Sequence, residues 1–154
     1  MTLRQVGLYF EDYEVGMQVL TAGRTVTETD IVNFAGVSGD FVELHINADY
    51  ASKHPFGQRV AHGMLVASIA TGLATQTGML RDTVLAFREL ESWKFSQPIL
   101  IGDTVRVNLT VTELKAMPRL QGGLVSFDVK VLNQDDKTVQ SGVWKMLVLS
   151  RPTE

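Results

Sequence analysis

The stretch Gly63-Met-Leu-Val-Ala-Ser-Ile-Ala-Thr-Gly-Leu-Ala-Thr-Gln76 decides the fold of this chain. Residues on one stripe of it recur at helical spacing: Leu65, Ile69, Gly72 and Leu73. Most positions between them are alanines, serines or threonines, so the helix is apolar or small nearly all round. Such a helix is expected to be buried. Thr77-Gly78 is a typical helix end, and the sequence therefore predicts one long buried helix over residues 63–76.

After this helix the hydrophobic pattern changes to a period of two, which is typical of half-buried antiparallel strands. The expected strands are residues 83–95, 104–111, 125–131 and 138–149. The last of them is apolar on both faces, which predicts a central strand covered on both sides. Gly122-Gly123 and residues 133–137 are expected to be turns.

Before the long helix the sequence predicts short elements. Residues 18–26 form a possible strand, and Thr27-Glu-Thr-Asp30 is a helix-start signature in which Thr27 and Asp30 cap each other. Ser38-Gly39 ends that helix, and Asn47 is a candidate N-cap for a second helix over residues 48–53. The expected fold class is therefore α+β, with one antiparallel sheet packed on a buried helix in a single domain over residues 1–154.

Composition excludes several functions. The net charge of −3 leaves no basic stripe for a phosphate backbone, so nucleic acid is not an expected partner. The absence of cysteine excludes disulfides, a thiolate nucleophile and a cysteine zinc site. Residues 1–14 lack the pattern of a signal peptide, and residues 60–74 are too short to span a membrane. We therefore expect a cytoplasmic protein without a membrane partner.

The candidate site is the segment from Ser38 to Leu65, which contains all three histidines. Asp40 lies five residues before His45, and Gly63 lies where the long helix begins. An acid, an imidazole and a helix N-terminus are suited to activating water and stabilising an oxyanion. On spacing alone, however, the more common interpretation is that Asp40 is a turn former and His45 a structural residue.

The other two histidines have simpler interpretations. His62-Gly63 could be a satisfied histidine beside a turn glycine, and His54 is expected in a solvated loop next to Pro55. The spacing of the three histidines matches no common zinc pattern, so no metal site is expected.

The motifs Ser38-Gly-Asp40 with His45, and then Ala61-His-Gly-Met-Leu65, resemble those of the MaoC-like dehydratases, specifically the (R)-specific enoyl-CoA hydratases. The resemblance runs from Glu14-Val-Gly16 to Gly102-Asp103. It implies a hot-dog fold, in which an antiparallel sheet wraps around a long helix. It also implies a homodimer whose two sheets join, with a coenzyme A thioester entering near the subunit interface.

Residue by residue, the resemblance implies that Asp40 and His45 are the catalytic pair and that the Gly63 amide binds the thioester oxygen. The family usually has Asn-Pro where this chain has Val42-Glu43, and it usually has Asp where this chain has Asn47. Thr71 occupies a position where the family often has serine. The residues expected to bind substrate are Val42, Glu43, His62, Met64 and Thr71.

The implied reaction is reversible hydration of a 2-enoyl-CoA to a 3-hydroxyacyl-CoA. It needs no cofactor, because coenzyme A is part of the substrate. Three alternatives share the implied fold: a hydratase for branched or dicarboxylic acyl-CoA, a hot-dog acyl-CoA thioesterase, and a non-catalytic acyl-CoA-binding domain.

Overall fold

The computed structural model describes residues 6–153. In this range six strands form one antiparallel sheet in the order β1-β4-β5-β6-β3, with β2 beside β4. The strands are β1 (Gln18–Leu20), β2 (Arg24–Thr25), β3 (Val84–Phe95), β4 (Thr104–Met117), β5 (Gly122–Leu132) and β6 (Thr138–Leu149). The helices are α1 (Glu28–Ser38), α2 (Glu43–Ile46), α3 (Ala48–Ser52) and α4 (Gly63–Gln76), with 3-10 turns η1 (Phe10–Asp12) and η2 (Pro118–Leu120).

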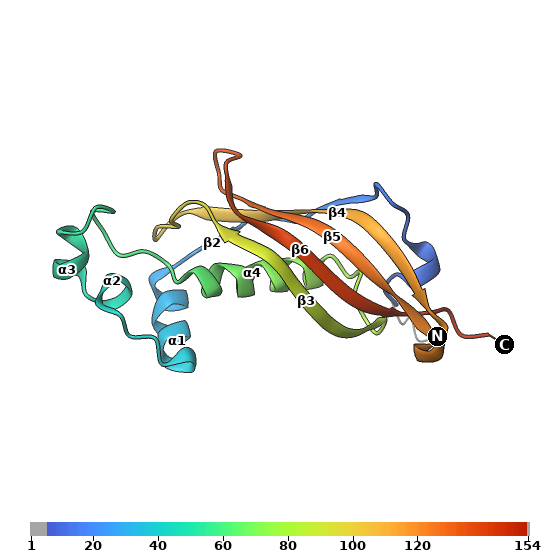
Figure 1. Ribbon diagram of the computed structural model, residues 1–154. Coiled ribbons are helices and arrows are strands. Elements are labelled where there is room, and N and C mark those ends of the chain that lie inside the picture. The colour runs from blue at the N-terminus through green and yellow to red at the C-terminus, as the bar shows by residue number, and fades with distance from the viewer. Residues whose placement is uncertain (1–5, 154) are drawn as a thin grey trace, which may run out of the picture.

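The long helix α4 lies along the inside of the curved sheet, as predicted (Figure 1). Its inner side joins one apolar core with the strands, through Leu65, Val66, Ile69, Leu73, Leu109, Phe127 and Val129. The helix is not buried all round, however. An exposed stripe at spacings of three and four residues consists of Met64, Ser68, Gly72 and Thr75. Gly72 therefore faces away from the core, contrary to the predicted stripe.

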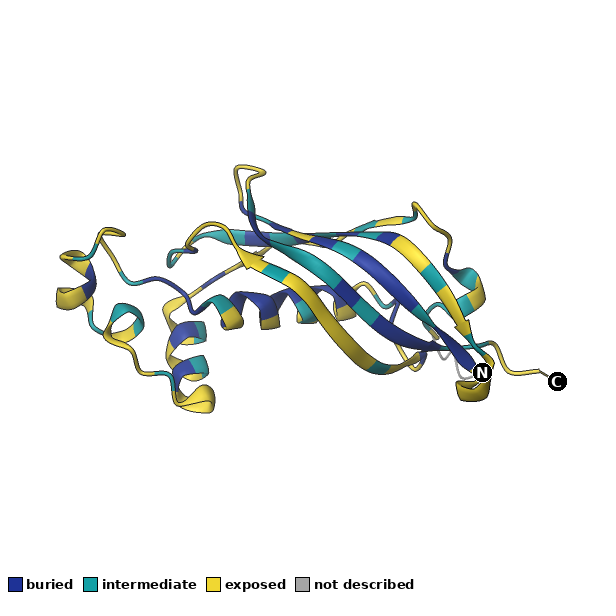
Figure 2. Cartoon of the chain, viewed as in Figure 1, coloured by how far each residue is buried: buried dark blue, intermediate teal, exposed yellow. Residues whose placement is uncertain are grey.

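The strand β6 lies between β5 and β3, which confirms the prediction of a central strand. Its most buried ring, Trp144, contacts the rings of Phe87 and Trp93 on β3. In contrast β3 pairs with β6 alone among the described strands, and most of its residues are exposed (Figure 2). The sheet thus ends in a long, partly apolar edge strand.

The prediction that Gly122-Gly123 is a turn was wrong. Both residues lie inside β5, paired with β4 on one side and β6 on the other. A Cβ atom at Gly122 would lie 2.2 Å from the Val148 carbonyl oxygen, and one at Gly123 would lie 2.2 Å from the ring of Phe10. Glycine is needed here because other groups approach the strand closely, while η2 makes the turn.

The single strand predicted over residues 18–26 is divided into β1 and β2. Between them the Thr21 hydroxyl accepts a hydrogen bond from the Val107 amide at 2.9 Å and donates to the Ala22 carbonyl oxygen at 2.8 Å. A side chain therefore replaces part of the backbone ladder, which interrupts the regular strand.

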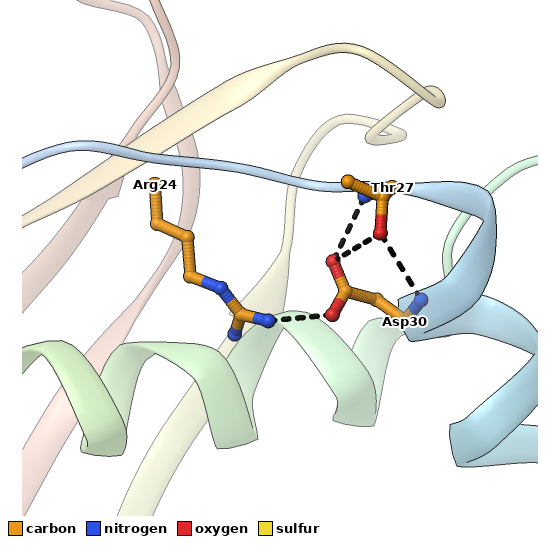
Figure 3. Close-up of polar contacts among 3 residues, drawn as sticks. All are labelled: Arg24, Thr27 and Asp30. Carbon is orange, nitrogen blue, oxygen red and sulfur yellow. Dashed lines mark hydrogen bonds and ion pairs between the residues drawn. The ribbon is translucent and has the colours of Figure 1, made fainter.

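Helix α1 begins with the predicted capping box (Figure 3). The Asp30 amide donates to Thr27 Oγ1 at 3.2 Å, and the Thr27 amide donates to Asp30 Oδ2 at 2.9 Å. Arg24 on β2 forms an ion pair with the other oxygen of Asp30. The helix ends at Gly39, which has a φ of 75°. These bonds connect the start of α1 to the sheet.

The helices α1, α2 and α3 form a group beyond the N-terminal end of α4, past the ends of the long strands (Figure 1). The predicted cap of α3 is confirmed, since Asn47 Oδ1 accepts from the Tyr50 amide at 3.0 Å. Several large apolar side chains of this group are exposed: Val32, Val37, Phe41, Val42, Ile46 and Tyr50. Within residues 6–153, no helix has the length and apolar character needed to cross a membrane.

Candidate active site

His45 lies on α2, a single helical turn that no sequence signal marked. Its Nδ1 atom is 2.7 Å from the backbone carbonyl oxygen of Val60. Because a carbonyl oxygen only accepts hydrogen bonds, the proton is assigned to Nδ1, which donates it. This bond orients the imidazole and leaves Nε2 as the nitrogen available for chemistry.

Asp40 follows Gly39 at the end of α1 and is held by local hydrogen bonds. Its amide donates to Ser38 Oγ at 3.1 Å, and the Ser38 hydroxyl donates to the Phe34 carbonyl oxygen at 2.7 Å. The Val42 amide donates to Asp40 Oδ1 at 3.3 Å. The carboxylate therefore sits in a defined turn between α1 and α2.

His62 is the N-cap residue of α4 and is only 2% exposed. Its Nε2 atom is 3.0 Å from the backbone carbonyl oxygen of Asp40. The His62 ring stacks on His45 with a centroid distance of 3.8 Å, and its centroid is 5.0 Å from that of Phe34. Its buried Nδ1 atom has no hydrogen-bond partner within residues 6–153.

The structure brings Asp40, His45 and His62 together, with one ionisable-group atom from each lying within 4.8 Å of the others. They open onto a cavity of about 610 Å³, a volume that suits a small organic ligand. The cavity is lined by Phe34, Ser38, Asp40, His45, His62, Gly63, Met64 and Phe95.

The arrangement of the two rings disfavours a metal ion between them. A metal lies near the plane of each imidazole that binds it, because the nitrogen lone pair lies in that plane. The rings of His45 and His62 are stacked with only 26° between their planes, so their lone pairs do not converge on one nearby point. One nitrogen of each ring is also engaged with a carbonyl oxygen.

Gly63 is the first residue of α4, where helix amides lack partners within the helix. The side chain of the preceding residue, His62, makes no capping bond to these amides. The helix dipole adds positive potential at the same place. This end of α4 therefore has the character of an oxyanion-binding position at the wall of the cavity.

Phe95, at the end of β3, packs directly on Gly63. A Cβ atom at Gly63 would lie 2.6 Å from Phe95 Cδ1. The Gly63 carbonyl oxygen accepts from Gln140 Nε2 at 2.9 Å, and Gln140 Oε1 accepts from Trp93 Nε1 at 3.1 Å. The start of α4 is thus held by β3 and β6, and glycine is needed for the close approach of the phenyl ring.

A second cavity of about 340 Å³ adjoins the first, since Gly63 and Phe95 line both. Sequence reasoning missed Phe34, Phe95 and Gln140 as parts of this region. Phe95 was recognised only as the end of a predicted strand, and no local pattern indicates that its ring reaches a helix start far away in the chain.

Other residues expected at the site lie elsewhere or serve another contact. Val42 and Glu43 do not line the 610 Å³ cavity, and Glu43 Oε1 instead accepts from Asn47 Nδ2 at 2.9 Å. Thr71 lies two turns along α4, in a separate pocket beside β3, and donates to the Ser68 carbonyl oxygen. The substrate-binding roles of these three residues remain predictions from the resemblance.

His54 differs from the solvated loop residue that was expected. It is half-buried, with its ring 5.0 Å from that of Phe56 and 6.4 Å from that of Tyr50. It does not line the cavity of Asp40 and His45.

The fold and the site together define a class: a hot-dog domain with an acid and an imidazole beside the start of its long helix. A family model described as MaoC like domain matches residues 11–133. The chain therefore belongs to the MaoC-like domain family.

Relatives of the chain include Protein MaoC of Klebsiella aerogenes, which is 42% identical over 102 residues. That match covers 66% of this chain but only 30% of the Klebsiella protein. An (R)-specific enoyl-CoA hydratase of Rhodospirillum rubrum is 41% identical over 106 residues, covering 69% of this chain and 71% of the hydratase. The relatives thus include proteins named for hydration of enoyl-CoA.

Solved structures agree over nearly the whole chain. A monoamine oxidase regulatory protein from Archaeoglobus superposes with a TM-score of 0.87 at 34% identity, covering 95% of this chain and 97% of that one. A Mycobacterium tuberculosis protein with a double hotdog fold superposes with a TM-score of 0.84 at 21% identity, covering 99% of this chain and 47% of that one. The second match concerns the fold alone.

Proposed function

We propose that this protein catalyses the reversible hydration of a 2-enoyl-CoA thioester to a 3-hydroxyacyl-CoA. One observation carries the proposal: Asp40, His45 and the start of α4 line the same cavity of about 610 Å³. The relative from Rhodospirillum rubrum, named (R)-specific enoyl-CoA hydratase, supports this choice of reaction.

In the proposed reaction a water molecule binds between Asp40 and His45. Its oxygen bonds to the β-carbon of the substrate while the Asp40 carboxylate accepts its proton. The proton passes from Asp40 to the unprotonated His45 Nε2, the ring nitrogen that the Val60 carbonyl leaves free, and Nε2 then donates it to the α-carbon. The hydroxyl group of the water is thereby added to the β-carbon and a proton to the α-carbon. Both side chains return to their starting state.

Attack at the β-carbon moves negative charge onto the thioester oxygen. We place this oxygen at the amides of the first turn of α4, including that of Gly63, because they lack capping partners and the helix dipole favours an anion there. This chemistry needs no cofactor.

The same acid, imidazole and helix start are also suited to hydrolysis of the thioester. A non-catalytic domain would use the cavity for binding alone. Incubation with a panel of straight-chain, branched and dicarboxylic enoyl-CoAs, followed by mass spectrometry, separates these functions. Hydration adds the mass of one water to an intact thioester, whereas hydrolysis releases free coenzyme A thiol. The proposal predicts the first product, and thiol release or no product from any substrate would contradict it.

We also propose that the protein is a cytoplasmic homodimer formed through β3. Among the described strands, β3 has a neighbour on one side only, and its exposed apolar residues are Val84, Leu85, Phe87, Leu90 and Phe95. An edge strand of this length and composition is a template for pairing with a second chain. Since Phe95 also lines the cavity, pairing at β3 would take place beside the site.

A further inference from the structure

His62 touches both members of the acid–imidazole pair from inside the protein. It is 2% exposed, it bonds the Asp40 main chain through Nε2 at 3.0 Å, and its ring stacks on His45 at 3.8 Å. Since it is also the N-cap of α4, it connects the Asp40 backbone, the His45 imidazole and the start of the helix. No other residue within 6–153 has these three contacts together.

The hydrogen bond to Asp40 determines the tautomer of the His62 ring. The Asp40 carbonyl oxygen only accepts, so the proton is assigned to Nε2 and the neutral ring keeps a lone pair on Nδ1. That Nδ1 atom is buried and without a partner in the described part of the chain. Leaving a buried polar atom unpaired costs stability, whereas a phenyl ring would pack without this cost.

We propose that His62 is a positioning residue. Its Nε2–H donates to the Asp40 carbonyl oxygen and thereby holds the Asp40 carboxylate at the distance from His45 at which both can contact one water molecule. The donor is the property that phenylalanine lacks, and it offsets the unpaired Nδ1 atom. The resemblance implied that His62 binds substrate. The role proposed here is positioning instead, and no proton transfer is assigned to His62. The inference rests on the proposed hydration, in which both groups must contact one water molecule.

Two substitutions distinguish the role of the His62 hydrogen-bond donor from that of its aromatic ring. His62→Phe keeps a ring for stacking on His45 but removes the Nε2–H donor. His62→Gln removes the ring but places a side-chain amide donor at a similar distance from the backbone. We expect His62→Phe to lower kcat by about tenfold to a hundredfold with little change in KM, the effect of a misplaced catalytic group. We expect His62→Gln to restore most of that loss.

The chain offers a matched control in His54. It too is a histidine packed among aromatic rings, and its buried Nδ1 atom has no partner among residues 6–153, but it lies outside the cavity. His54→Phe should therefore leave kcat unchanged. Thermal melting of all variants shows whether any loss of rate is a loss of folded protein.

The nitrogen-15 NMR spectrum of the wild-type histidines tests the hydrogen bond without any substitution. The inference requires the His62 ring to carry its proton on Nε2. A proton on Nδ1 instead, unchanged kcat in His62→Phe, or equal losses in His62→Phe and His62→Gln would each overturn it. If wild-type protein hydrates no enoyl-CoA, the proposed function fails, and the NMR result alone then decides whether His62 holds Asp40.

Discussion

Asp40 and His45 come from different elements but are oriented by similar means, since each is held by backbone groups. The carboxylate accepts from the Val42 amide, and the imidazole donates to the Val60 carbonyl oxygen. Asparagine at position 40 can still accept from the Val42 amide, and glutamine at position 45 can still donate to the Val60 carbonyl oxygen, so these substitutions change the chemistry and preserve the type of contact.

We expect Asp40→Asn and His45→Gln each to lower kcat by about a hundredfold to ten-thousandfold, the usual contribution of general acid–base catalysis. If both groups contact one water, the double variant should be little worse than the worse single one. Steady-state kinetics of the three proteins measures this. Asp49→Asn and His54→Gln, which change the same residue types outside the cavity, should keep wild-type rates, and multiplying effects of the two active-site changes would contradict a shared water.

Gly63 and Phe95 are a second pair of residues in direct contact at the site. In Gly63→Ala the new Cβ atom would collide with the phenyl ring, which is 54% exposed in the single chain and would have to shift. We therefore expect the fold to survive and kcat/KM to fall, because the ring lines the cavity. If Phe95 is first replaced by alanine, the factor by which Gly63→Ala lowers kcat/KM should be about tenfold smaller than in wild type. Additive effects across the four proteins would mean that Gly63 acts through its amide alone.

Tyr13 predicts a stability change at alkaline pH. Burial, assisted by nearby Asp12, raises the pKa of Tyr13 to about 12 from an ordinary value of 10.0. A raised pKa stabilises the folded state fully below the unfolded pKa, and this contribution is lost as pH rises from 10.0 to about 12. Between about pH 9 and about pH 11.5 wild type should lose about 2 kcal/mol more unfolding free energy than Tyr13→Phe. Urea titrations at both pH values measure this, and equal losses would contradict it.

At the scale of the element, α1 carries Asp40 at its C-terminal end, while its N-terminal end is attached to the sheet through Arg24 and Asp30 (Figure 3). The capping box therefore contributes to the position of the site as well as to helix stability.

We expect Thr27→Ala to lower the unfolding free energy by about 1 kcal/mol, because the Asp30 amide loses its acceptor. Thr29→Ala is the matched control, since Thr29 is exposed in the same helical turn but lies outside the capping box. Urea denaturation of both variants measures the difference. Equal stability of the two would show that the box contributes nothing measurable.

At the scale of the whole molecule, the sheet has a long apolar edge at β3, and the α1–α3 group projects past the sheet with apolar side chains exposed (Figures 1 and 2). Each feature favours association with another chain.

We expect sedimentation velocity to show a dimer at micromolar concentration. Leu90→Lys should raise the dissociation constant by about a hundredfold or more, because the lysine charge would be buried without a partner. Leu120→Lys is the matched control. Leu120 is 40% exposed, against 41% for Leu90, but lies in η2 and is not part of β3. A wild-type monomer, or equal effects of the two substitutions, would contradict pairing at β3.

The sequence by itself determined the elements whose signals lie in consecutive residues. Helical spacing and a terminal Thr-Gly defined α4, the Thr27–Asp30 box and Gly39 defined α1, and Asn47 defined the start of α3. Asp40, His45 and Gly63 were also recognisable, because their motifs are short segments of sequence. Caps and periodicity are local properties, so they can be predicted without knowing which segments meet.

Only the tertiary structure decided how those residues are supported. His62 reaches Asp40 across 22 positions and Gln140 reaches Gly63 across 77, while the Phe95 ring comes from an edge strand. Gly122 and Gly123 were mistaken for a turn for the same reason, since Val148 and Phe10 approach them from distant parts of the chain. Such contacts depend on how the helices and the sheet pack around α4, which brings together residues that carry no common local pattern.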